Sequence, residues 1–354
     1  MTGNNPVPTP PHKGRAFAPP LRGGVGTGFG ISWEYYFKPR PCNPNHQDPQ
    51  AMKLAAIDIG SNAARMQINS VLENDGRVTF KKLEYIRFPL QLGKDVFHGG
   101  MIGERREANL TKFLHACKLL IELHEVSACR ICATSAMREA RNGAEVVQRI
   151  QAALGMEIQV INGDQEAELV NKVVVQELDE KNYIHIDVGG GSTELNVYAN
   201  RRKLAAKSFR IGSVRLTEEP EKSAMQWPAI EEWINTQLTG IQGEIRAVGT
   251  GGNIAKVYEL AKLHRFARQE KSGIIGREDI AATRDFVAGF SVEDRIHKLR
   301  LNPDRADVIV PAAQIYLFVM QCANADLMLV PDVGLIDGMI LSLYQKTAGT
   351  DGGV

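Results

Sequence analysis

The chain has 354 residues, of which 44% are hydrophobic, and its 42 basic and 41 acidic side chains give a net charge of +1. A chain of this length can bury a sizeable core in two domains, and its balanced charge argues against a protein dedicated to coating nucleic acid. Five scattered cysteines do not form a disulfide framework, so we expect a reducing, cytoplasmic environment. We also expect no membrane partner, since neither a signal-peptide core nor an apolar stretch of membrane-spanning length occurs.

Residues 1–51 differ in composition from the rest of the chain, because they contain ten of its sixteen prolines and only two acids. Such a segment buries too little apolar surface to fold alone, so we predict a disordered, Pro-rich N-terminal extension. The glycine run Gly24–Gly30 imitates a nucleotide-binding loop, but no strand precedes it, and we interpret it as a linker. The aromatic stretch Trp33–Phe37 is a candidate for docking a partner.

From Met52 onward, strand-like and helix-like stretches alternate, which is typical of α/β architecture. In the first half, the sequence predicts strands over 53–57, 66–71, 78–86, 129–134 and 157–161, and helices over 104–123, 137–154 and 165–177. Asp164, an N-cap residue type, should open the last of these helices. Cys129 and Cys132 have the spacing of zinc and redox sites, but residues three apart on a strand face opposite sides, so we interpret both as core residues.

The second half continues the alternation. It predicts strands over 183–188, 193–198, 203–209, 245–248 and 327–330, and helices over 229–239, 253–262, 308–321 and 335–346. A turn is expected after residue 209. The eight histidines form no metal-binding pair at helical spacing, and His185 is interpreted as a packed strand residue.

Three of the predicted strands end in glycine and hydroxyl residues, as phosphate loops do. The three loops are Asp58-Ile59-Gly60-Ser61-Asn62, Asp187-Val188-Gly189-Gly190-Gly191-Ser192 and Gly249-Thr250-Gly251-Gly252-Asn253. Glycines allow backbone N–H groups to approach a phosphate. Because a carboxylate repels phosphate, the natural partner of Asp58 and Asp187 is a divalent cation that itself touches the phosphate. Two acid-tipped loops, about one small domain apart, indicate a duplicated fold with a metal and a phosphate chain between two lobes.

The ordered motifs resemble the exopolyphosphatase/guanosine pentaphosphate phosphatase (Ppx/GppA) family. The matching segments are 58–62, 133–140, 163–167, 187–194, 212–216 and 249–253, and the resemblance runs from about Met52 to the C-terminus. It implies an α/β, actin-like (ribonuclease H-like) duplicated two-domain fold with an interdomain cleft. Domain I is expected over 52–178, joined by the C-terminal helix 335–354, and domain II over 179–334.

The resemblance also implies roles for individual residues. It assigns Glu166 to activation of the attacking water, although its place in the first turn of a helix also suits a residue that only interacts with the helix dipole. Asp58, Asp187 and Glu194 are the candidate ligands of Mg²⁺, with Mn²⁺ as an alternative. Loop donors and guanidinium forks suit phosphate oxygens. The candidate phosphate-binding residues are Ser61, Asn62, Arg65, Arg138, Gly190, Gly191, Ser192, Thr193, Arg215, Gly251 and Gly252.

Two positions depart from the family pattern: Gln165 stands where many members have a second glutamate, and Ile336 where many have an arginine. The leading expectation is a Mg²⁺-dependent hydrolase that releases terminal orthophosphate from inorganic polyphosphate or guanosine pentaphosphate. A catalytically weak binding regulator and an ATP-dependent small-molecule kinase are the alternatives. The sequence does not fix the oligomeric state, and a homodimer is left open.

Overall fold

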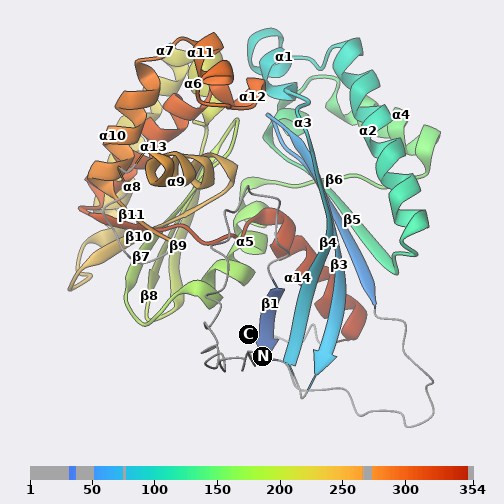
Figure 1. Cartoon of the computed structure of the whole chain (residues 1–354), viewed down its shortest axis with the longest axis horizontal. Helices are drawn as coiled ribbons and strands as arrows, with labels where there is room; N and C mark the ends of the chain where they lie inside the picture. The colour runs from blue at the N-terminus through green and yellow to red at the C-terminus, as the bar shows by residue number, and fades with distance from the viewer. Residues whose placement is uncertain (1–31, 37–51, 75–76, 265, 267–272, 350–354) are drawn as a thin grey trace, which may run out of the picture.

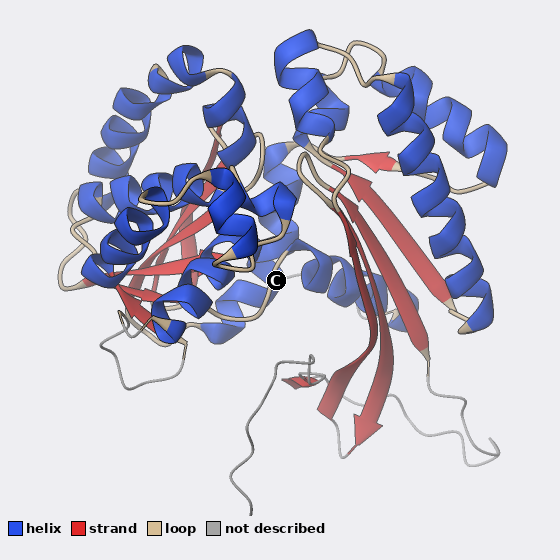
Figure 2. Cartoon of the chain, turned by 45° about the horizontal axis from the view of Figure 1, so that its top comes forward, coloured by secondary structure: helices blue, strands red, loops and turns tan. Residues whose placement is uncertain are grey.

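A computed structural model describes residues 32–36, 52–74, 77–264, 266 and 273–349. Two six-stranded sheets form two lobes that lie side by side, with helices packed around them (Figure 1, Figure 2). Within the described ranges, no helix is both long enough and apolar enough to cross a membrane.

The first sheet has the strand order β1-β4-β3-β2-β5-β6. Its strands are β1 (Ser32–Tyr36), β2 (Lys53–Ile59), β3 (Ala64–Asn74), β4 (Arg77–Phe88), β5 (Ala128–Ala133) and β6 (Gln159–Val160). β2, β3 and β4 form an antiparallel meander, whereas β5 pairs parallel with β2 and β6 pairs parallel with β5. Every residue of β2 after Lys53 is buried, because this central strand is covered on both faces.

The second sheet has the order β11-β12-β10-β7-β8-β9. Its strands are β7 (Asn182–Val188), β8 (Thr193–Ala199), β9 (Arg202–Phe209), β10 (Ile245–Thr250), β11 (Ile274–Gly276) and β12 (Leu327–Leu329). β7, β8 and β9 again form an antiparallel meander, and β10 and β12 again add in parallel. The order β9-β8-β7-β10-β12 therefore repeats β4-β3-β2-β5-β6, which confirms the predicted duplication. It places β2 and β7 in equivalent central positions.

Helices cover the sheets and fill the space between them (Figure 2). In the first part of the chain they are α1 (Leu92–Gly99), α2 (Glu104–Leu123), α3 (Ser135–Glu139), α4 (Gly143–Leu154) and α5 (Gly163–Glu177). They continue with α6 (Ser213–Glu218), α7 (Pro220–Ala224), α8 (Gln226–Leu238), α9 (Gly252–Leu263), α10 (Arg277–Ala288), α11 (Val292–His297), α12 (Pro303–Ala306), α13 (Ile309–Cys322) and α14 (Leu335–Ala348). α14 packs against α5, β2 and β5. We keep 52–178 with 335–354, and 179–334, as our proposal for the two domains.

Each lobe has its own hydrophobic core, and a third core lies between the two sheets. The third core includes Leu54 of β2, Val173 of α5, Val248 of β10 and Met339 of α14, all of which are buried. Because α5 and α14 contribute to this shared core, they fix how the two central strands face each other.

The structure departs from the sequence predictions at Ser32–Tyr36. This stretch, which overlaps the candidate docking segment Trp33–Phe37, forms β1 and pairs antiparallel with β4. For these residues the prediction of disorder is wrong, because aromatic residues favour strands and the edge of β4 offers unpaired backbone groups. The run Gly24–Gly30 and the other residues of 1–51 lie outside the described residues.

The predicted helix 137–154 is wrong at its start, where α3 ends at Glu139 and α4 begins at Gly143. Asn142 explains the break: its side-chain amide is buried, donates to the carbonyl oxygen of Ile102 at 2.9 Å and accepts from the N–H of Ile102 at 2.9 Å. These tertiary bonds compete with a continuous helix.

Two smaller predictions also need correction. Asn162, not Asp164, caps α5, because its side chain accepts from the N–H of Gln165 at 2.9 Å in a capping box. Of the two cysteines interpreted as core residues, Cys132 is buried but Cys129 is exposed. Their opposite orientations follow from their spacing on β5.

Gly338→Ala should lower the free energy of unfolding by about 1–3 kcal/mol, the usual cost of overpacking. α14 crosses α5 so closely that a Cβ on Gly338 would lie 2.0 Å from the carbonyl oxygen of Leu169, which is backbone and cannot move aside cheaply. Gly99→Ala is the matched control, since a Cβ there would meet no atom within 4 Å. Urea unfolding of both variants measures the difference, and equal stability would contradict the close crossing.

Candidate functional site

A pocket of about 340 Å³ lies between the two lobes, which confirms the predicted interdomain cleft. Most of the predicted site residues line it. They are Asp58, Ser61, Asn62, Arg65, Glu166, Asp187, Gly190, Ser192, Gly251 and Gly252. Residues that are more than a hundred positions apart in the sequence therefore meet in one cavity.

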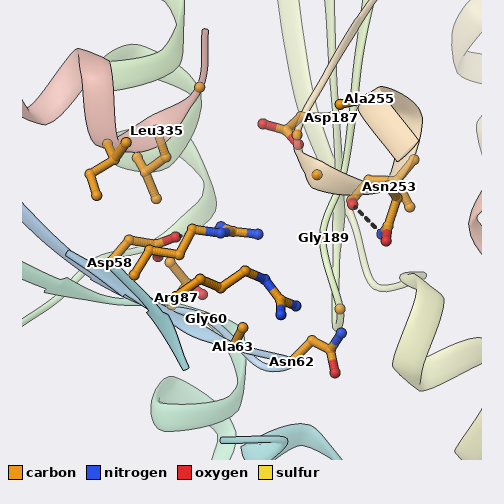
Figure 3. A pocket seen from close by; sticks show the side chains of 18 of the residues that line it. Asp58, Gly60, Asn62, Ala63, Arg87, Asp187, Gly189, Asn253, Ala255 and Leu335 are labelled. Atoms are coloured by element: carbon orange, nitrogen blue, oxygen red, sulfur yellow. Dashed lines mark hydrogen bonds and ion pairs between the residues drawn. The ribbon is translucent and has the colours of Figure 1, made fainter. Parts of the chain in front are cut away.

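The two acid-tipped loops form opposite walls of the pocket. Asp58 lies near the end of β2 and Asp187 near the end of β7, and their side chains face each other across the cavity (Figure 3). The loops also touch: a Cβ on Gly190 would lie 2.9 Å from the Cβ of Ser61 and 3.3 Å from the backbone nitrogen of Asn62. A glycine is needed at 190 because this approach leaves no room for a side chain.

The third glycine loop joins the wall that carries Asp187. Gly251 has φ 92°, a conformation that suits glycine, and it is the N-cap of α9. The Asn253 side chain donates to the carbonyl oxygen of Val188 at 3.3 Å, which links the second and third loops. The first N–H groups of α9 are thereby placed at the pocket, where an anion is favoured by the helix dipole.

Three arginines converge on the pocket, and the sequence analysis identified only Arg65. Arg65 donates to Asp58 at 2.8 Å, and Arg87, whose side chain projects into the pocket (Figure 3), pairs with Asp304 of the second lobe. The side chain of Arg305 makes no hydrogen bond or ion pair with another described residue. Burial, together with the like charges of Arg87 and Arg65, lowers its pKa to about 10. Such a crowded set of cations is ready to accept an anion.

The cross-strand register explains how Arg87 comes to lie beside Arg65. The two residues are paired partners in β3 and β4. Their proximity could have been inferred only with the β3–β4 register in hand, which the sequence did not supply. Arg305 comes from the short helix α12, for which no element was predicted.

Four carboxylates gather at the pocket: Asp58, Glu166 and Asp187 line it and Glu194 lies beside Asp187, and burial raises the pKa of each. For Asp58 and Asp187 the charge of Arg65 acts in the opposite direction. Burial and then Asp187 raise the pKa of Glu194 to about 7. For Glu166, burial is followed by the charges of the other three carboxylates, which raise its pKa well above the ordinary value. Burial is the largest cause in each case, so the site disfavours four charged carboxylates at once.

This donor set fits a divalent cation. Carboxylate oxygens are the ligands that Mg²⁺ prefers, and Glu166 Oε2 is buried without a hydrogen-bond partner among the described residues. Among the residues that the structure describes, no three Asp, Glu, His or Cys side chains lie close enough together to form a complete metal cluster. The fit is therefore to a cation that takes few protein ligands and completes its shell with water and phosphate oxygens, as Mg²⁺ usually does.

Five predicted residues do not line the pocket: Arg138, Gly191, Thr193, Glu194 and Arg215. Glu194 is buried beside Asp187, its cross-strand partner, and accepts from Ser208 Oγ at 2.8 Å. Thr193 donates its hydroxyl to the carbonyl oxygen of Ile211 at 2.6 Å, so it is not available to phosphate. Arg138 donates to the carbonyl oxygen of Ile161. Its charge partly offsets the rise that burial causes in the pKa of the nearby Glu166 and Glu194.

Arg215, predicted as a phosphate clamp, instead supports the second loop from behind. Its side chain is buried, donates to the carbonyl oxygen of Gly191 at 2.7 Å, pairs with Glu139 at 2.5 Å and stacks on Phe97 at 4.0 Å. These contacts engage its guanidinium. Its contacts therefore support the second loop, and its predicted phosphate contact stays a prediction.

The two departures from the family pattern have different surroundings. Gln165 is exposed, and its side-chain oxygen accepts from the N–H of Asn162 at 3.0 Å within the capping box, which glutamine and glutamate serve equally well. Ile336 is buried on α14 and lines the pocket, where it gives an apolar surface.

The two sheets repeat one strand order. Between them lie three glycine-rich loops, clustered carboxylates and converging arginines. This combination defines a two-lobed phosphate-binding protein. The sequence profile of the Ppx/GppA phosphatase family matches residues 71–347, so the chain belongs to this family. The resemblance inferred from the motifs is thereby confirmed.

Individual relatives agree with this membership. The chain is 27% identical to a bifunctional 3-dehydroquinate synthase/phosphatase of Fusobacterium nucleatum over 81% of its own length, but spans only 46% of that relative. It is 23% identical to exopolyphosphatase 1 of Mycobacterium leprae, covering 84% of this chain and 91% of that one.

Solved structures of the family share the fold. The Aquifex aeolicus family member is 25% identical, with a TM-score of 0.64 over 85% of this chain and 99% of that one. An exopolyphosphatase from Cytophaga hutchinsonii is 21% identical, with a TM-score of 0.73 over 84% of this chain and 98% of that one. The predicted α/β duplicated fold is confirmed.

Proposed function

We propose that the chain is a Mg²⁺-dependent phosphoanhydride hydrolase that releases terminal orthophosphate from inorganic polyphosphate. The observation that carries the proposal is the convergence of Arg65, Arg87 and Arg305 above two facing aspartates in one pocket. Lys82 and Lys256 add two further cations to the lining, where Lys256 pairs with Glu259 at 2.7 Å. A chain of linked phosphates carries charge at every unit and matches such a lining. The name of the mycobacterial relative supports the same substrate class.

Glu166 would act as the general base. It lies in the first turn of α5, lines the pocket and has one carboxylate oxygen without a partner among the described residues. Burial and the neighbouring carboxylates raise its pKa, which makes its carboxylate a stronger base toward water. In the proposed step, water loses a proton to Glu166 and its oxygen attacks the terminal phosphorus. The bond from phosphorus to the bridging oxygen then breaks, and the shortened chain leaves with the electron pair.

Asp58 and Asp187 would hold the metal from opposite walls, with Glu194 adding negative charge from behind. When bound, Mg²⁺ supplies positive charge that offsets the charge on the transferred phosphoryl group. The raised pKa of the two aspartates supports this assignment, because a cation would relieve their buried charge.

The loops and the arginines would bind the phosphates on either side of the broken bond. Backbone N–H groups near Ser61, Gly190 and Gly252 suit the terminal phosphate, since all three loops meet where glycines leave space. Arg87 and Arg305 would bind the next phosphates and stabilise the leaving group.

A second candidate substrate is guanosine pentaphosphate. It presents the same terminal anhydride, and one feature of the pocket favours it: Tyr85 lines the cavity with 47% of its surface exposed. An exposed aromatic ring offers a stacking surface for a base.

A phosphate-release panel with long polyphosphate, short polyphosphate and guanosine pentaphosphate, each with Mg²⁺, tests the proposal. We expect orthophosphate release from long polyphosphate to exceed release from the nucleotide, because the arginines and lysines of the pocket can bind several consecutive phosphates. Tyr85→Leu should lower turnover of the nucleotide selectively. Tight binding without release from any substrate would instead support a regulator, and transfer from ATP to a small molecule would support a kinase.

A further inference from the structure

A chain of buried polar side chains runs beneath the pocket and ends on Asp187. His185 lies two residues before Asp187 on β7, so both side chains project from the same face of the strand. The imidazole is fully buried and does not line the pocket. Its Nδ1 lies 2.9 Å from Asn196 Nδ2, and its Nε2 lies 2.8 Å from Thr250 Oγ1. Thr250 is the register partner of Asp187 between β10 and β7, and its hydroxyl stabilises the charged form of the Asp187 carboxylate.

The direction of these hydrogen bonds is fixed by their last member. An ionised carboxylate attracts the single hydroxyl proton of Thr250 and has no proton of its own to donate. The oxygen of Thr250 must then accept from His185, which places the imidazole proton on Nε2. Nδ1 is left as an acceptor for the amide of Asn196. Each side chain in the row thus orients the next one.

The Asp187 carboxylate needs such an anchor because like charges surround it. Glu194 is its cross-strand partner, and Asp58 and Glu166 also lie within electrostatic range. Repulsion among these groups favours rotation of the carboxylate away from them. A Cβ on Gly251 would lie 2.9 Å from Asp187 Oδ1, so the carboxylate rests against the loop that directly follows Thr250.

We propose that His185 and Thr250 are positioning residues that hold the Asp187 carboxylate in the orientation that binds the divalent cation. The inference rests on the metal site of the proposed function. His185 occupies a lone pair of the Thr250 oxygen, and this leaves the hydroxyl proton directed at Asp187. Outer hydrogen bonds of this kind commonly change metal affinity by about 10- to 100-fold.

A Mn²⁺-binding titration in the presence of orthophosphate tests the positioning role directly. Binding is measured as the loss of the electron paramagnetic resonance signal of free Mn²⁺. Thr250→Val keeps the shape but removes the hydroxyl, and we expect about 10- to 100-fold weaker Mn²⁺ binding. Thr250→Ser restores the hydroxyl and should bind within about threefold of the wild type. His185→Phe should weaken binding, whereas His185→Gln, which keeps a donor to Thr250, should weaken it less.

Thr283→Val is the control for the loss of a buried hydroxyl, because Thr283 is buried in α10 and donates to the carbonyl oxygen of Asp279 at 2.7 Å. It should leave Mn²⁺ affinity unchanged. Equal affinity in the wild type and Thr250→Val, or equal weakening in Thr250→Ser, would overturn the proposal. A wild type that binds no Mn²⁺ would overturn the metal site and this inference together. If Mn²⁺ binds but no phosphate is released from any substrate, the proposed function fails. The comparison of Mn²⁺ affinity between Thr250→Val and Thr250→Ser then still decides whether Thr250 positions Asp187.

Discussion

Glu166→Gln should lower turnover by about two to four orders of magnitude, the usual scale for the loss of a general base. Glutamine has nearly the same shape but cannot accept the proton from water. The fold should survive, and the sign of the pKa shift supports this. Burial and neighbouring carboxylates raise the pKa of Glu166, so its charged form is disfavoured in the folded state. A neutral side chain should therefore leave stability unchanged or increase it.

Glu168→Gln provides the matched control, because Glu168 lies on the same helix but is exposed. It should keep wild-type turnover. Steady-state phosphate release and urea unfolding of both variants separate chemistry from stability. Near wild-type turnover in Glu166→Gln would show that another group activates the water.

Much of the fold could be predicted because its determinants are local. Hydrophobic alternation located the central strands, and the paired acid–glycine motifs on β2 and β7 revealed the duplication that the equivalent sheet orders confirm. The failures arose where tertiary contacts override local preference. Asn142 breaks a predicted helix by bonding to the backbone of Ile102, which has no local signal. The aromatic residues of β1 favour a strand, but β1 is stabilised by pairing with β4, a contact that its own sequence does not specify.

The candidate site divides in the same way. Asp58, Asp187 and the glycines sit in motifs whose chemistry can be read along the chain. Arg87 and Arg305 could not be identified, because they enter the pocket through strand register and through a four-residue helix. Arg215 stays a prediction: its motif position is conspicuous, but it is buried outside the pocket lining, and its side chain donates to the carbonyl oxygen of Gly191.

Asp187→Asn should lower Mg²⁺-supported phosphate release by about 10²–10³-fold, the scale for losing one preorganised electrostatic group. Asp187 faces Asp58 across the pocket, and burial raises its pKa, so the amide removes a charge that the fold itself disfavours. Thermal stability should therefore hold or rise while activity falls, a combination that general damage to the fold does not produce. Asp332→Asn is the control, since Asp332 also lines the pocket but is exposed. Chelation should abolish wild-type activity and added Mg²⁺ or Mn²⁺ should restore it, whereas full activity in chelator would exclude the metal site between the two loops.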